Sequence, residues 1–215
     1  MIHIKDFINE KLIINKDSET RKYKYFPKTK EELKQILYKK IISEEDGPNS
    51  NLNDIDISGV NDLSMLFIDF KDKIENIDIS KWNVSRVRNM RNMFNGCKKF
   101  NCDLSKWNVS HVTDMKGMFC RCESFNSDIS SWDVSKVKNM SNMLQKCEKF
   151  NCDISKWDVS HCEEFEAMLS GCINLSCNLE TWKVNSNELS YMLKKCDKIM
   201  KPSWYKEWEK NQNED

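Results

Sequence analysis

Cysteine and histidine are the residues in this chain that could bind a metal or form covalent links. The 215-residue sequence holds ten Cys and three His, namely His3, His111 and His161. A structural zinc site usually requires closely spaced ligand pairs such as C-x-x-C. No C-x-x-C pair occurs, and the three histidines are not spaced as partners. The sequence therefore predicts no metal site.

Most cysteines recur at a fixed spacing and form two columns, a column being the residues at one position of successive sequence repeats. The first column is Cys97, Cys122, Cys147, Cys172 and Cys196; the second is Cys102, Cys152 and Cys177, with Ser127 in the missing position. Stacked repeats place such residues about 4.8 Å apart, wider than the roughly 3.8 Å between Cβ atoms of a disulfide. We therefore expect unpaired, buried thiols. Pairing within a unit, Cys97 with Cys102, is the alternative if the chain is exported.

Burial of the first cysteine column also predicts the effect of a polar replacement. A serine in this column is expected to bury a hydroxyl without a partner, which destabilises a protein by about 1–3 kcal/mol. Cys162 supports the small apolar interpretation, because it occupies a position that Val holds in other repeats.

The remaining reactive residues do not form a catalytic arrangement. His111 and His161 share one column with Arg86 and Lys136, which is typical of a mixed basic column facing solvent. No Ser, Cys or carboxylate accompanies the histidines in a nucleophile pattern. Five glycines form no phosphate-binding loop. We expect neither enzymatic activity nor a cofactor.

An internal repeat of about 25 residues must position all of these side chains. A tryptophan recurs at Trp82, Trp107, Trp132, Trp157 and Trp182, and a valine follows two residues after each. Methionine, Phe or Leu, and Cys columns complete the unit, and the pattern degrades at both ends. Six units therefore run from about residue 55 to 200.

The spacing within one unit predicts its secondary structure. Trp-x-Val has a period of two, which favours a short strand with both side chains turned inward. From Val112 to Cys122 the apolar residues recur every three to four positions, which favours a two-turn helix. The predicted fold class is an α/β repeat solenoid. It would be a leucine-rich-repeat-like stack of about six short parallel strands, with short helices on the other face and a helical N-terminal cap.

Three regions follow from this pattern. Residues 1–50 form the predicted N-terminal cap region, with a helix at about 29–43 whose capping box joins Thr29 to Glu32. A small strand is expected at residues 12–14. Residues 51–200 are the predicted leucine-rich-repeat solenoid. Residues 201–215 are the predicted C-terminal cap, formed by Trp204, Tyr205 and Trp208, with a disordered polar tail from Glu209.

The repeat F-N-x-D-L-S-x-W-N-V-S-x-V-x-x-M-x-x-M-F, from Phe100 to Phe119, resembles the BspA-like leucine-rich repeats of bacterial surface proteins and mycoplasma lipoproteins. The segment Pro27–Leu33, followed by Leu52–Asp56, is similar to the cap that opens many such domains. The resemblance covers about residues 26–205. It implies a solenoid whose surface-located members serve adhesion or other protein–protein contacts.

The exposed residues beside each Trp are the candidate binding surface, because this face of a leucine-rich solenoid usually contacts the partner. The candidates are Lys81, Asn83, Lys106, Asn108, Ser131, Asp133, Lys156, Asp158 and Lys183. Hydrogen bonding along the face, with no role in binding, is the alternative interpretation, above all for the serines that follow each Val. The expected function is non-catalytic protein–protein interaction.

Charge and hydropathy limit the other partners. Lys plus Arg and Asp plus Glu number 34 each, which argues against a general nucleic-acid binder. No apolar run of about 18 residues predicts a membrane span, and no signal peptide is visible. We therefore expect a monomeric, cytoplasmic chain. A surface or adhesion protein whose leader is missing from this sequence is the alternative.

Overall fold

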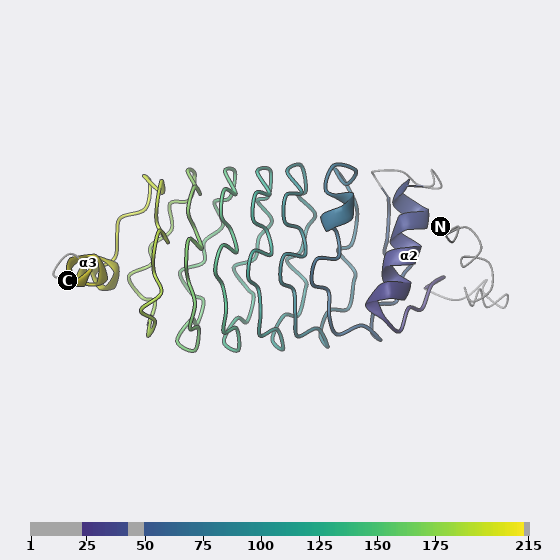
Figure 1. The fold of residues 1–215 in the computed structure, drawn as a ribbon, viewed down its shortest axis with the longest axis horizontal. Coiled ribbons are helices and arrows are strands. Elements are labelled where there is room, and N and C mark those ends of the chain that lie inside the picture. Colours follow the sequence, from purple (N-terminus) through teal and green to yellow (C-terminus); the bar gives the residue numbers. More distant parts are fainter. Residues whose placement is uncertain (1–22, 43–49, 213–215) are drawn as a thin grey trace, which may run out of the picture.

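The sequence repeat is also a structural repeat. The structure, a computed structural model, describes residues 23–42 and 50–212. A row of similar coils lies side by side between helix α2 (Lys30–Ile42) at one end and helix α3 (Ser203–Asn211) at the other (Figure 1). Each unit of about 25 residues forms one coil, and each coil contains one residue of the Trp column. We number coils 1 to 6 by their first residues, which are Leu52, Ile79, Leu104, Ile129, Ile154 and Leu179.

A series of isolated parallel β-bridges, at one recurring position of the repeat, connects neighbouring coils. The bridges join Asp62 to Asn89, Asn89 to Asp114, Asp114 to Asn139, Asn139 to Glu164, and Glu164 to Glu188. Each bridge is isolated, so within the described ranges the coils contain no extended strand.

The predicted Trp-x-Val strand is therefore wrong, although both side chains are buried as expected. Its backbone is committed to turns within its own coil. The Trp107 N–H donates to Leu104 O at 3.0 Å, and the Val112 N–H donates to Val109 O at 2.8 Å. These groups are consequently not available for pairing with the next coil.

The predicted two-turn helices are also wrong. In coil 2 every second N–H, from residue 90 to 96, donates to a carbonyl of coil 3 at 2.8–2.9 Å. The N–H groups between them close turns inside coil 2, as when Met93 donates to Met90 O at 3.1 Å. An α-helix would instead direct every N–H to the fourth preceding residue. Within residues 23–42 and 50–212 the coils contain one helical segment, the 3-10 helix η2 (Ile68–Phe70) in coil 1.

Left-handed residues explain why the turns replace a helix. Coil 2 contains two successive turns of this kind, and the third residue of each has positive φ: Asn92 (53°) and Gly96 (81°). A third residue with positive φ is what a type II turn requires, and it interrupts an α-helix. The same two columns recur at Gly117, Asn142, Ala167 and Tyr191, and at Arg121, Lys146, Gly171 and Lys195. Consecutive turns also bury residues three to four apart, so they satisfy the same apolar spacing.

Aromatic columns fill the space inside the coils. The rings of Phe67, Phe94 and Phe119 stack nearly parallel, with centroids 5.1 and 5.5 Å apart. Phe100 and Phe125, in a second column, lie 6.2 Å apart with an interplanar angle of 6°. Each ring therefore packs against two neighbouring coils, and none could be buried by one coil alone.

The tryptophan column joins the coils by hydrogen bonds as well as by packing. Each indole N–H donates to a carbonyl of the preceding unit at 2.9–3.1 Å. The pairs are Trp82 to Leu52, Trp107 to Ile79, Trp132 to Leu104, Trp157 to Ile129, and Trp182 to Ile154. The only polar atom of each indole is thus satisfied inside the core.

The first cysteine column makes a comparable set of contacts. The Sγ atoms of Cys122, Cys147, Cys172 and Cys196 lie 2.9–3.1 Å from carbonyl oxygens of Phe94, Phe119, Leu144 and Leu169. All ten cysteines are free thiols in the structure. The expectation that a serine here would have no partner is therefore wrong, because a carbonyl acceptor is already in place.

Two members of the second cysteine column accept hydrogen bonds from backbone N–H groups. The Leu104 N–H donates to Ser127 Oγ at 2.8 Å, and the Ile129 N–H donates to Cys152 Sγ at 3.3 Å. Both side chains thus serve the backbone N–H of the first residue of their own coil. This shared role explains why Ser127 can take the place of Cys in the column.

Replacing Cys147 tests the carbonyl contact. We expect Cys147→Ser to destabilise the fold by no more than Cys147→Ala, about 1–2 kcal/mol each, because the hydroxyl can donate to Phe119 O. Cys162→Ser is the matched control, since its nearest carbonyl acceptors lie at 3.4 and 3.5 Å. Urea denaturation under reducing conditions measures all three. A serine at 147 that costs clearly more than the alanine would contradict this assignment.

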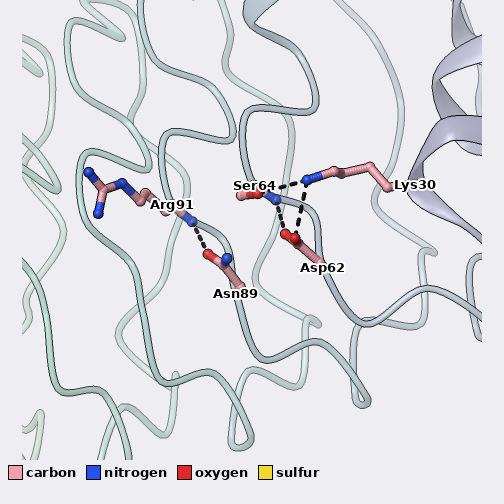
Figure 2. Close-up of polar contacts among 5 residues, drawn as sticks. All are labelled: Lys30, Asp62, Ser64, Asn89 and Arg91. Carbon is pink, nitrogen blue, oxygen red and sulfur yellow. Dashed lines mark hydrogen bonds and ion pairs between the residues drawn. The ribbon is translucent and has the colours of Figure 1, made fainter.

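Helix α2 closes the N-terminal end, and it lies within the predicted range. The Glu32 N–H donates to Thr29 Oγ1 at 3.1 Å, while the Glu32 carboxylate accepts from the Lys28 N–H. Lys30 Nζ lies 3.1 Å from Asp62 Oδ2 and 2.9 Å from Ser64 Oγ, which ties the helix to coil 1 (Figure 2). The strand predicted at residues 12–14 lies outside the described residues.

Helix α3 closes the C-terminal end and continues the tryptophan pattern. Trp204 Nε1 donates to Leu179 O at 3.0 Å, the same contact that the core tryptophans make with their preceding coil. Trp208 Nε1 donates to Asn187 O, and Tyr205 is buried. The helix extends to Asn211, so the disordered tail predicted from Glu209 is wrong for residues 209–211. The ion pair of Glu209 with Lys201 helps to hold this last turn.

Candidate binding surface

An exposed turn follows the tryptophan in four consecutive coils. The residue between Trp and Val places its Oδ1 at 3.1–3.2 Å from the backbone N and at 2.6–2.7 Å from the Oγ of the serine two positions later. The pairs are Asn83 with Ser85, Asn108 with Ser110, Asp133 with Ser135, and Asp158 with Ser160. These Asx turns fix the local backbone. One oxygen or nitrogen of each side chain therefore remains for a partner.

Coil 6 shows that the Asx turn requires a side chain with an acceptor atom. Lys183 occupies the Asn/Asp position and Asn185 the serine position. Lysine has no acceptor atom, so the Asx turn is absent and residues 182–186 adopt no turn. Val184 is correspondingly only half-buried, whereas Val159 in coil 5 is 1% exposed.

The two aspartates of this set are charged at neutral pH. Hydrogen bonds from the hydroxyl and the backbone N–H of Ser135 lower the pKa of Asp133. The same two groups of Ser160 lower the pKa of Asp158. Coils 4 and 5 therefore carry fixed negative charge on this edge, whereas coils 2 and 3 carry neutral asparagines.

All of the predicted binding residues are exposed and lie along one edge of the row of coils. We name this set the Trp-flanking row: Lys81, Asn83, Lys106, Asn108, Ser131, Asp133, Lys156, Asp158 and Lys183. Its backbone forms turns and not the predicted strand face. The hydrogen-bonding interpretation of Asn and Asp is confirmed, and it leaves one atom of each side chain without a role in the turn.

An asparagine column at the bends between coils has a structural role. Asn101 Oδ1 accepts from the Asn126 N–H at 2.8 Å, and Asn126 Oδ1 accepts from the Asn151 N–H at 2.9 Å. Each asparagine therefore links its coil to the next one. Because these side-chain oxygens accept hydrogen bonds from the next coil, the asparagines are not candidates for binding.

A surface hollow beside the Trp-flanking row was missed by sequence reasoning. It has a volume of about 450 Å³ and is lined by Ser58, Gly59, Asn61, Ser85, Arg86, Arg88 and His111. Three coils contribute to it, so no single repeat contains its pattern. A usable signal was the clustering of arginine: three of the five in the chain, Arg86, Arg88 and Arg91, fall within six residues.

The described residues also bear on metal binding and on membrane spans. Among residues 23–42 and 50–212, no three His, Cys, Asp or Glu side chains gather in a way that could hold a metal ion. None of the helices described is long and apolar enough to cross a membrane.

The chain is thus a repeat protein of stacked coils with a large buried core and an exposed, polar row on one edge. It belongs to the family described as "Mycoplasma protein of unknown function, DUF285", whose model matches residues 38–140 and again residues 121–215. Among curated proteins, none matches the chain significantly.

Proposed function

We propose that the row of coils is a leucine-rich-repeat-like solenoid of BspA type, and that it binds a protein partner through the Trp-flanking row without catalysing a reaction. The observation that carries this proposal is the row itself. Exposed side chains occupy the same positions on successive coils, while the residue directly after each Trp changes from neutral to acidic to basic along the row. A rigid scaffold that varies only its exposed side chains is how repeat proteins build specific surfaces.

The middle of the row is where we place the strongest contacts. Asp133 and Asp158 lie on adjacent coils, and Lys156 between them in sequence is exposed as well. Central contacts are the ones that an interface shields best from water. The row contains no exposed aromatic residue, so we expect a polar, salt-sensitive interface of modest affinity.

The chain itself supplies the best variant for testing this surface. Asparagine forms the same Asx turn at positions 83 and 108. We therefore expect Asp133→Asn combined with Asp158→Asn to keep the melting temperature and to weaken partner binding about tenfold, by removing two charges without disturbing the turns. The partner is first captured by cross-linking and mass spectrometry, and a binding isotherm with the purified partner then measures the effect.

Charge reversal provides the comparison. Asp133→Lys should lower stability by about 1 kcal/mol in addition to any effect on binding, because Lys183 in coil 6 forms no Asx turn. Asp128→Asn with Asp153→Asn is the matched control, since both side chains are exposed outside the row and accept from the N–H groups of Ser130 and Ser155, so the variant removes the same charge and keeps the turns. Unchanged binding by the double asparagine variant would remove the Trp-flanking row as the interface.

A further inference from the structure

Arginine is rare in this chain and concentrated on coil 2. The sequence contains 29 Lys and five Arg, yet Arg86, Arg88 and Arg91 follow one another within six residues. Lysine would supply the same charge at these positions. The planar guanidinium differs by offering paired N–H donors that match a carboxylate, so arginine is preferred where such a group is recognised.

The side chains of Arg86 and Arg88 are exposed on coil 2. Within residues 23–42 and 50–212, neither guanidinium makes a hydrogen bond or ion pair. Lys98 and Lys99 of the same coil differ, because they pair with Glu123 and Glu75 respectively. The fold thus pairs Lys98 and Lys99 with carboxylates and leaves Arg86 and Arg88 open to solvent.

The backbone holds both arginines at the rim of the hollow. The Arg88 N–H donates to Asn61 O at 2.9 Å, and Arg88 O accepts from the Thr113 N–H at 2.8 Å and from Thr113 Oγ1 at 3.1 Å. Arg86 lies in the turn closed by the Val87 N–H and Val84 O at 2.9 Å. The links of Arg88 to coils 1 and 3, and the turn that contains Arg86, fix the backbone positions of both arginines. A fixed backbone lowers the entropy cost of binding.

We propose that this hollow binds the carboxylates of a short acidic segment of a protein partner, with Arg86 and Arg88 as the anchoring residues and His111 completing the rim. The inference rests on the proposed function and names the chemistry of the partner. The hollow lies directly beside Asn83, because Ser85 both lines it and closes the Asx turn of Asn83. One extended segment could therefore contact the hollow and the Trp-flanking row together.

The charge distribution favours a short acidic peptide over a nucleic acid. Lys136 and Lys138 continue the columns of Arg86 and Arg88 on coil 4, but coil 5 carries Glu163, Glu164 and Glu166. On the other side, Asp56 of coil 1 accepts a hydrogen bond from the N–H of Ser58, which lines the hollow. A phosphate backbone needs an extended basic track to follow, and these acidic residues limit the length of the basic columns. A short basic patch instead suits a ligand with a few carboxylates.

The test uses the whole chain and a fluorescein-labelled decapeptide of alternating Glu and Ser, with binding followed by fluorescence anisotropy. We expect Arg86→Gln combined with Arg88→Gln to raise the Kd at least tenfold. Lys136→Gln with Lys138→Gln is the matched control, because it removes the same charge from the same columns on coil 4. It should change the Kd less than about threefold. Arg86→Lys with Arg88→Lys should be intermediate, since charge remains but paired donors are lost.

Three results would overturn the inference: no binding of the acidic peptide, equal losses in the arginine and lysine pairs, or tighter binding of a single-stranded oligonucleotide of equal charge. The proposed function is tested separately by the asparagine variants at 133 and 158. If those variants weaken partner binding while the acidic peptide does not bind, only the inference fails. If the peptide binds through Arg86 and Arg88 while the asparagine variants have no effect on the partner, only the Trp-flanking row fails.

Discussion

Raising the pH from 7 to 10 should remove at least about 7 kcal/mol from the free energy of unfolding, a loss comparable to the whole stability of a typical domain. Buried thiols cause this loss. Burial raises the pKa of Cys97 and of Cys162 to about 12 and places the pKa of Cys122, Cys147 and Cys172 well above the ordinary value of 9.0.

The sign of this change in stability follows from whether the thiol is protonated in the folded and in the unfolded chain. Below pH 9 the thiol is protonated in both the folded and the unfolded chain, so it does not affect stability. Above pH 9 the unfolded chain releases the proton while the buried thiol keeps it, and unfolding becomes more favourable up to about pH 12. One pH unit above the ordinary pKa, each such thiol costs about 1.4 kcal/mol, and five thiols give about 7 kcal/mol.

Urea denaturation at pH 7, 8, 9 and 10 with a reducing agent measures the loss. Cys162→Val provides the control, because valine occupies this position in coils 2, 3 and 4, at Val87, Val112 and Val137. The variant should lose about 1.4 kcal/mol less than the parent at pH 10. A parent chain with the same stability at pH 7 and pH 10 would show that the thiols ionise freely and are not buried.

The stacking of the repeats in register could be predicted from the sequence. Stacking follows directly from a 25-residue period, because a Trp, a Phe and a Cys that recur in register must be buried against their neighbours. The cap at α2 carries its own start signal in Thr29 and Glu32, whose capping hydrogen bond is present. Trp204 was also recognisable as part of the C-terminal cap, although its use of the same carbonyl contact as Trp182 was not.

The path of the backbone within each coil could not be predicted, because helices and consecutive turns bury residues at nearly the same spacing. Hydrogen bonds to the next coil decide between them, and they depend on left-handed residues such as Arg121 and Lys146, whose types do not predict positive φ. The glycines indicate some of the positions with positive φ. Gly96, Gly117 and Gly171 all lie in the two left-handed columns.

The candidate surface was predicted in position but not in structure. Exposure of the residue between Trp and Val follows from its neighbours being buried. The Asx turn was also readable, since Asn or Asp followed two residues later by Ser is a common turn pattern. The hollow was not readable, because Asn61, Arg88 and His111 come together only when three coils are stacked.

Trp132→Ala should destabilise the fold by about 3–5 kcal/mol, whereas Trp204→Ala should cost only about 1–2 kcal/mol. Both indoles donate to a leucine carbonyl, at 3.1 Å for Trp132 and 3.0 Å for Trp204. The two variants therefore lose the same hydrogen bond. They differ in packing, because Trp132 is 4% exposed among coils on both sides and Trp204 is half-buried at the end of the row.

Trp132→Phe separates the two contributions at the central position. It keeps most of the ring volume and removes the N–H, and Leu104 O still accepts from the Trp107 N–H at 3.0 Å. Since that carbonyl is not left unpaired, we expect a cost of about 1–2 kcal/mol, well below that of alanine. Urea denaturation followed by circular dichroism measures all three variants. Equal losses for Trp132→Ala and Trp204→Ala would mean that the central coils do not share their core, contrary to the stacked arrangement of Figure 1.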